Sequence, residues 1–136
     1  EPFQIGEPKI IKEGSDIVVF AMGYMVGLAL EAAKELEETV SVKVVNVPTI
    51  KPLNQAAIRA AAKDCKAVVT AEEHNIKGGL GSAIAEALCK ERKPIEFVGI
   101  EDTFGCSAHN YQELLAYFGL TAEHIKEAVI KMNQYR

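Results

Sequence analysis

Along this chain, short apolar runs alternate with longer segments in which apolar residues recur at helical spacing. The strand-like runs cover residues 17–21, 42–47, 66–73 and 95–100. The run 17–21 is apolar at every position, which is typical of a strand covered on both faces. Strands separated by helices predict parallel βαβ units with right-handed crossovers. We therefore expect an α/β fold, a three-layer α/β/α sandwich whose mostly parallel sheet has about five strands, one of them an antiparallel edge strand formed by the first residues.

Helical periodicity marks the segments between these runs. Apolar stripes predict helices within residues 25–38, 54–65 and 78–91, and two more helices at 111–118 and 121–132 close the chain. Asn54 and Asn110 stand where N-caps are expected. The residues that we expect to face the core are Met25, Leu28, Ala29, Ala32, Ala33 and Leu36 in the first helix, and Leu80, Ile84, Ala87 and Leu88 in the third.

Composition limits the class of protein. The chain has 136 residues, 49% of them apolar, which suits one domain with a core. We expect residues 1–8 to be a linker and residues 9–136 to form that domain. The net charge of −4, without a basic cluster, argues against nucleic acid, and no apolar stretch reaches the roughly 18 residues of a membrane helix. The odd number of widely spaced cysteines indicates reduced thiols and a cytoplasmic protein; they are Cys65, Cys89 and Cys106.

The stretch TAEEHNIKGGLGSAIAEAL, residues 70–88, is the leading candidate for a site. It passes from a strand into a helix, and ligands of such sheets bind beyond the carboxyl ends of the strands. The amides of the helix N-terminus could hold an anion or phosphate, or the glycines could serve only a tight turn and close helix–sheet packing. Neither nucleotide-binding fingerprint is complete, because position 84 is Ile84 and no Gly-Lys-Ser/Thr follows. The candidate anion-binding or interdomain residues are His74, Gly78, Gly79, Gly81 and Ser82.

His74 follows two acidic residues, Glu72 and Glu73. The imidazole could act in acid–base chemistry or as a metal ligand, or it could be a hydrogen-bonded structural group or face a partner subunit. A metal site needs three or four converging ligands, and only a carboxylate accompanies His74 locally. We therefore expect no metal site in this chain.

Two further groups follow the last strand. Cys106 and His109 could form a nucleophile and its base, but the sequence offers no group to orient the histidine. The alternative is a loop that caps the next helix. Glu101 and Asp102 could bind a cation or complement a helix N-terminus. None of these groups completes a catalytic site, so we expect no catalytic residue here.

Four stretches together resemble a known family. They are GSDIVVFAMGYMVGLALEAAKELE, VVNVPTIKPLN, TAEEHNIKGGLGSAIAEAL and GIEDTFGCSAHNYQELLAYFGLTAEHIKEAV. In this order they resemble the C-terminal domain of transketolase and of its relatives, 1-deoxyxylulose-5-phosphate synthase and the beta subunits of 2-oxo-acid dehydrogenases. The resemblance runs from about residue 10 to residue 132. The phrase NVPTIKPLN is similar to transketolases more than to the others, and most of all to the C-terminal section of a split transketolase.

The resemblance implies a role within a larger enzyme. Transketolases transfer a two-carbon ketol unit between sugar phosphates, in the pentose phosphate pathway, with thiamine diphosphate and a divalent metal such as Mg²⁺. Their C-terminal domain is an accessory layer that braces the dimer and supplies no essential catalytic residue. The implied partners are the diphosphate-binding and pyrimidine-binding domains, on the same or a separate chain, with residues 1–8 leading from the latter.

The same resemblance implies what this chain does alone. We expect it to bind neither thiamine diphosphate nor the metal, and to be inactive by itself. The complete enzyme is expected to be a homodimer, with the turn at His74 near a neighbouring domain or subunit. The alternatives are the same domain of a deoxyxylulose synthase or dehydrogenase beta subunit, a stand-alone anion-binding module, or a small enzyme that uses Cys106.

Overall fold

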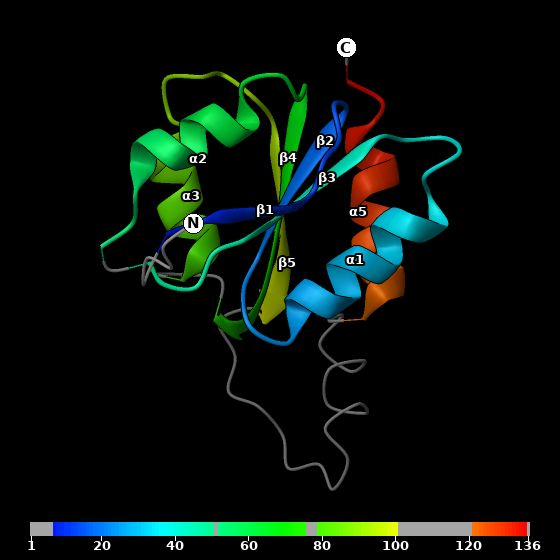
Figure 1. The fold of residues 1–136 in the computed structure, drawn as a ribbon, viewed down its shortest axis with the longest axis horizontal. Coiled ribbons are helices and arrows are strands. Elements are labelled where there is room, and N and C mark those ends of the chain that lie inside the picture. Colours follow the sequence, from blue (N-terminus) through cyan, green and yellow to red (C-terminus); the bar gives the residue numbers. More distant parts are fainter. Residues whose placement is uncertain (1–6, 51, 76–78, 101–120, 136) are drawn as a thin grey trace, which may run out of the picture.

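The computed structural model describes residues 7–50, 52–75, 79–100 and 121–135. Within these residues, five strands form one sheet between two pairs of helices (Figure 1). The sheet order is β1-β3-β2-β4-β5, and β1 is the antiparallel edge strand beside β3, while the other neighbours are parallel. The predicted three-layer sandwich is confirmed. The strands are β1 (Lys9–Lys12), β2 (Ile17–Ala21), β3 (Val42–Asn46), β4 (Ala67–Asn75) and β5 (Ile95–Ile100).

Strand β2 is the centre of the sheet because it pairs with both β3 and β4. All five of its residues are fully buried, as its unbroken apolar run predicts. Ile17 and Val19 belong to the core on one face of the sheet, and Val18 and Phe20 to the core on the other. The alternation of side chains along a strand thus supplies two cores from one short segment.

The helices cover the two faces in pairs. Helices α2 (Gln55–Ala62) and α3 (Leu80–Ala87) lie on one face, and α1 (Met25–Glu35) and α5 (Ala122–Met132) lie on the other (Figure 1). The predicted inward residues of α1 and α3 are buried, except Leu28, which is partly buried against the core. Asn54 caps α2 as predicted, since its side chain accepts a hydrogen bond from the Ala57 amide at 3.0 Å. The helix expected at 111–118 and its cap Asn110 lie outside the described residues.

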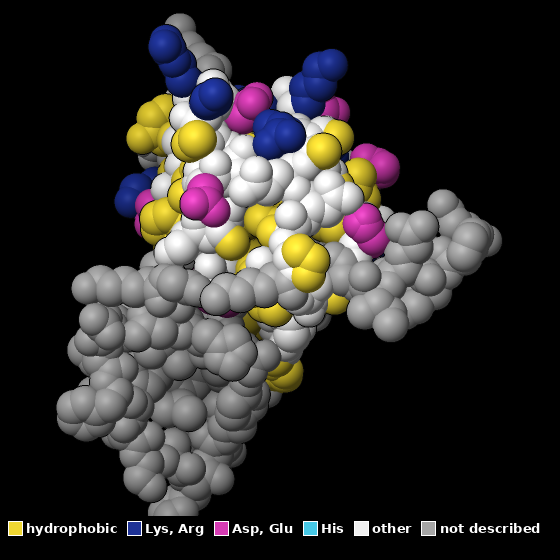
Figure 2. Space-filling model, turned by 90° about the vertical axis from the view of Figure 1, so that its left-hand side faces the viewer, with side chains coloured by type: hydrophobic (Ala, Val, Ile, Leu, Met, Phe, Trp, Pro, Cys, Tyr) yellow, Lys and Arg dark blue, Asp and Glu magenta, His cyan; other side chains and the backbone are white. Residues whose placement is uncertain are grey.

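Lysine side chains close the carboxyl ends of two helices. The Lys43 ammonium in β3 donates to the Ala61 carbonyl of α2 at 2.9 Å, and Lys93 donates to the carbonyls of Ala62 and Lys63. Lys66 donates to the Asn133 carbonyl after α5 at 2.9 Å. The last carbonyls of a helix lack partners within the helix and carry negative partial charge, so ammonium groups satisfy them. Figure 2 shows Lys and Arg side chains gathered at the upper end of the α2–α3 side, away from the carboxyl ends of the parallel strands.

Candidate functional site

The parallel strands end at one edge of the sheet, where the turn between β4 and α3 also lies (Figure 1). Here β4 extends two residues beyond the predicted run of 66–73 and ends at Asn75. Its pairing with β5 is irregular, since Ala71 pairs with Val98 and Asn75 with Ile100. Four steps along β4 therefore match two along β5, which is a β-bulge. Bulges turn side chains from their regular direction and are frequent beside functional sites.

Glu72, at the start of this bulge, makes the main contact across the turn. Its side chain is 1% exposed. One carboxylate oxygen accepts a hydrogen bond from the Leu80 amide at 2.6 Å, and the other accepts one from the Gly81 amide at 2.7 Å. Leu80 and Gly81 are the first two residues of α3, whose amides have no acceptor within the helix. The carboxylate thus supplies both the hydrogen bonds and the negative charge that a helix N-terminus favours.

Gly81 allows α3 to approach the sheet at this point. A Cβ atom on Gly81 would lie 2.6 Å from Cδ1 of Phe97 and 3.1 Å from Oγ1 of Thr70. A real side chain does not fit there unless Phe97 moves. The close helix–sheet packing that the sequence offered as one interpretation of the glycines is therefore what the structure has at Gly81. Gly79 is the N-cap residue of α3 and has an extended backbone.

The structure describes only some of the remaining candidate residues. His74 lies in the bulged end of β4, but its side chain is outside the described part of the structure, as is the whole of Gly78. Ser82 is exposed in the first turn of α3. The groups at residues 101–109, with both acids, the cysteine and the histidine, also lie outside the described residues. The proposed roles of these residues stay predictions.

Sequence reasoning missed the role of Glu72. Its position in the strand could have shown this role. Val68, Thr70 and Glu72 are alternate residues of one strand, so their side chains lie on the same face, toward α3. Thr70 is fully buried, and its hydroxyl has no hydrogen-bond partner within the described structure. A glutamate on the inward face of a strand requires donors of hydrogen bonds or a positive charge. The helix that follows the strand supplies them.

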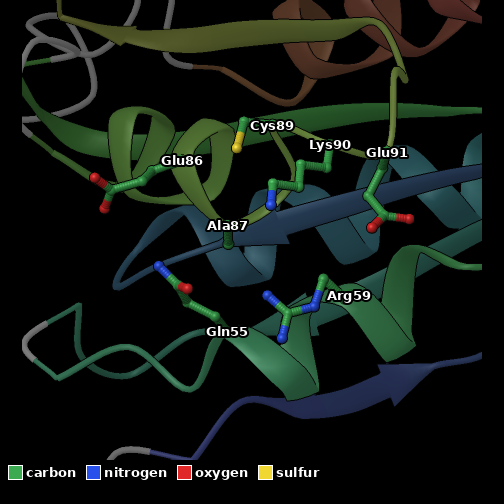
Figure 3. A pocket seen from close by; sticks show the side chains of 7 residues that line it. All are labelled: Gln55, Arg59, Glu86, Ala87, Cys89, Lys90 and Glu91. Atoms are coloured by element: carbon green, nitrogen blue, oxygen red, sulfur yellow. The ribbon is translucent and has the colours of Figure 1, made fainter.

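The cysteines differ in environment. Burial raises the pKa of the Cys65 thiol to about 11, so this thiol stays protonated and unreactive near neutral pH. Cys89 is exposed and lies beside a hollow of about 430 Å³ between α2 and α3 (Figure 3). The lining has both signs of charge, and all of its polar and charged residues are exposed. The residues are Gln55, Arg59, Glu86, Ala87, Cys89, Lys90 and Glu91.

The first two amides of α3 do not offer a site for the diphosphate of thiamine diphosphate. A diphosphate needs free N–H donors, whereas the Leu80 and Gly81 amides are already bound to Glu72. Within the described ranges, no three His, Cys, Asp or Glu side chains are grouped so that they could hold a metal ion. Nor does this part of the chain have a helix with the length and apolar character needed to cross a membrane.

Comparison with known proteins identifies the family. Residues 6–125 match the family model described as the C-terminal domain of transketolase. The chain is 39% identical, over 98% of its length, to a 6-deoxy-6-sulfo-D-fructose transketolase subunit, SqwH, of Clostridium sp. strain MSTE9, and covers 42% of it. It is 40% identical, over 90% of its length, to a 1-deoxy-D-xylulose-5-phosphate synthase of Chlorobium luteolum, and covers 20% of it.

A solved structure agrees with the sequence comparisons. A split-gene transketolase, described as an inactive tetramer of four beta subunits, superposes with a TM-score of 0.89 at 41% identity, over 98% of this chain and 44% of the other. The chain therefore spans less than half the length of these three proteins. The resemblance read from the sequence motifs is confirmed: this chain belongs to the family of transketolase C-terminal domains.

Proposed function

We propose that this chain is the accessory C-terminal domain of a thiamine-diphosphate-dependent transketolase. The complete enzyme transfers a two-carbon ketol unit between sugar phosphates, in the cytoplasm. The domain braces a homodimer and supplies no catalytic residue. Its partners are the diphosphate-binding and pyrimidine-binding domains of the same enzyme, on the same or a separate chain.

The observation that carries this proposal is the likeness to a split-gene transketolase over 98% of this chain but only 44% of that one. A chain that matches a relative almost completely, yet covers less than half of it, corresponds to one domain of a larger assembly. The chemistry of the described residues supports an accessory role, because Glu72 is committed to the α3 amides and the Cys65 thiol is buried.

The turn at the carboxyl edge is the part of the domain that we assign to contact with its neighbours. It contains His74, Gly78, Gly79 and the first turn of α3, including Gly81 and Ser82. Because Gly81 lies close to Phe97 and Thr70, the start of α3 packs directly on the sheet.

The test compares this chain with the complete enzyme. The chain alone is titrated with thiamine diphosphate and Mg²⁺ by calorimetry and assayed for ketol transfer between sugar phosphates; we expect neither binding nor turnover. The complete enzyme, with all three domains, is expected to have both. Micromolar binding of the cofactor by the chain alone would contradict the accessory role.

A second candidate function rests on the identity of 40% to a 1-deoxy-D-xylulose-5-phosphate synthase. The domain would then have the same accessory role in a different thiamine enzyme. The assay of the complete enzyme separates the two candidates by its product. Formation of 1-deoxy-D-xylulose 5-phosphate, with no ketol transfer between sugar phosphates, would favour the synthase.

A further inference from the structure

Glu72 contacts α3 in the way that a bound anion contacts a helix N-terminus, although it belongs to the same chain. The carboxylate is almost completely removed from water and approaches two backbone amides at 2.6 and 2.7 Å. Hydrogen bonds to a charged acceptor are shorter than those between neutral groups, and both distances are short. An external phosphate or carboxylate at a helix N-terminus would use the same donors. In this chain a residue eight positions before the helix occupies them.

We propose that Glu72 is a built-in anion that closes the α3 N-terminus to external anions and ties β4 to the start of α3. Residues 73–79 run between the two ends that this carboxylate joins. The carboxylate therefore joins the end of β4 to the first turn of α3. The inference does not depend on the transketolase assignment, because it concerns contacts within the described chain.

Three features of the surroundings adapt the site to a carboxylate. The bulge in β4 begins where Glu72 leaves the regular ladder. The absence of a side chain at Gly81 lets α3 come close enough for its amides to reach the strand. The buried Thr70 hydroxyl, which has no partner in the described structure, lies beside the site where a Gly81 side chain would be. Removal of the Glu72 carboxylate would leave a small polar cavity with two free N–H donors.

A small molecule can therefore replace the group that the variant Glu72→Ala lacks. The substitution removes a CH2–COO⁻ group, and acetate is that group with one added hydrogen. We expect acetate to bind in the variant and to restore the hydrogen bonds to Leu80 and Gly81. In the wild-type chain the same amides are occupied, so acetate and inorganic phosphate should leave them unchanged.

The experiment is a titration of the full ¹⁵N-labelled chain with sodium acetate, followed by the amide signals of Leu80 and Gly81. Sodium chloride at equal ionic strength controls for screening by salt. The matched control variant is Glu86→Ala, which removes an exposed carboxylate from the same helix. We expect saturable shifts of both amides, and a rise in melting temperature with acetate, in Glu72→Ala only. Equal shifts in the wild-type chain, or no response of Glu72→Ala, would overturn the proposal.

The variant Glu72→Gln keeps the test valid if Glu72→Ala does not fold. The amide side chain has one acceptor oxygen and an NH2 group, so it can accept only one of the two amides well. Hydrogen exchange at Leu80 or Gly81 should accelerate about tenfold or more, the loss expected for one bond to a charged acceptor. Unchanged hydrogen exchange at both amides would refute the proposed role of Glu72.

Discussion

The substitution Lys43→Met tests whether a buried lysine stabilises this fold by capping α2. Lys43 is 4% exposed, and its ammonium donates to the Ala61 carbonyl and to Asp64 Oδ1, both at 2.9 Å. Methionine is unbranched and apolar, so it retains most of the packing of the lysine stem. It removes the charge and all three donors. The substitution therefore isolates the polar contribution of Lys43.

The expected magnitude follows from the two contacts. A buried carbonyl that loses its donor costs about 1–3 kcal/mol, which applies to Ala61. The ion pair adds less than about 1 kcal/mol, because the Asp64 side chain is 62% exposed and screened by solvent. The ammonium no longer has to be dehydrated, which acts in the opposite direction. We expect the free energy of unfolding to fall by about 1–3 kcal/mol.

The assay is urea unfolding of the wild-type chain, Lys43→Met, Asp64→Asn and the double variant. Asp64→Asn isolates the ion pair and should cost less than about 1 kcal/mol at neutral pH. The hydrogen bond from Lys43 is the main cause that lowers the pKa of Asp64 from 3.8. A lowered folded-state pKa stabilises the fold above the unfolded-state pKa, and this stabilisation is lost as the pH falls through the folded-state pKa.

The effect of Asp64→Asn should therefore be present at pH 7 and disappear in strong acid. The cap on Ala61 involves no acidic group, so the effect of Lys43→Met should persist in part at low pH. The reasoning is refuted if Lys43→Met is as stable as the wild type or more stable. That result would mean that dehydration of the ammonium costs as much as its hydrogen bonds contribute.

Three other substitutions or measurements test separate features. Gly81→Ala should lower the free energy of unfolding by about 0–2 kcal/mol, because overpacking against Phe97 outweighs the gain in helix propensity. In a double-mutant cycle of urea unfolding, the same substitution should become neutral or stabilising when Phe97→Ala is also present. In the native chain, iodoacetamide should modify exposed Cys89 within the period that leaves Cys65 unmodified, because burial raises the pKa of Cys65 to about 11; mass spectrometry of peptides reads this out, and equal rates would contradict it. Arg92 has a φ of 58°, so Arg92→Val should lower the melting temperature through about 1–2 kcal/mol of strain, whereas Arg92→Gly should not.

Most of the fold could be predicted from local patterns. The unbroken apolar run of β2 indicated a strand buried on both faces, and all five residues are fully buried. The stripe in the third predicted helix indicated the face that packs on the sheet. Asn54 was recognised as an N-cap because its side chain needs only the amide three residues later. Each of these features depends on residues within about one or two helical turns of one another.

The candidate site was predicted only in position. β4 ends and α3 begins at the carboxyl edge of the sheet, as expected. The glycines alone did not show whether the N-terminus of α3 is free to bind an anion. That answer depends on the register shift in β4 after Ala71 and on the inward direction of Glu72. The two acids were expected at the end of the strand, but the sequence did not show that the first of them, Glu72, is buried. Burial of Glu72 becomes favourable only when the amides of α3 are within reach.

The sequence by itself determined the alternation of strands and helices, the residues that face the two cores, and the family. These properties follow from periodicity and from motifs that are contiguous in the chain. The tertiary structure alone decided which polar groups meet: Glu72 with the α3 amides, and Lys43 and Lys93 with the end of α2. The physical reason is that a hydrogen bond is short and directional, so its partner is set by the packing of elements that lie apart in sequence.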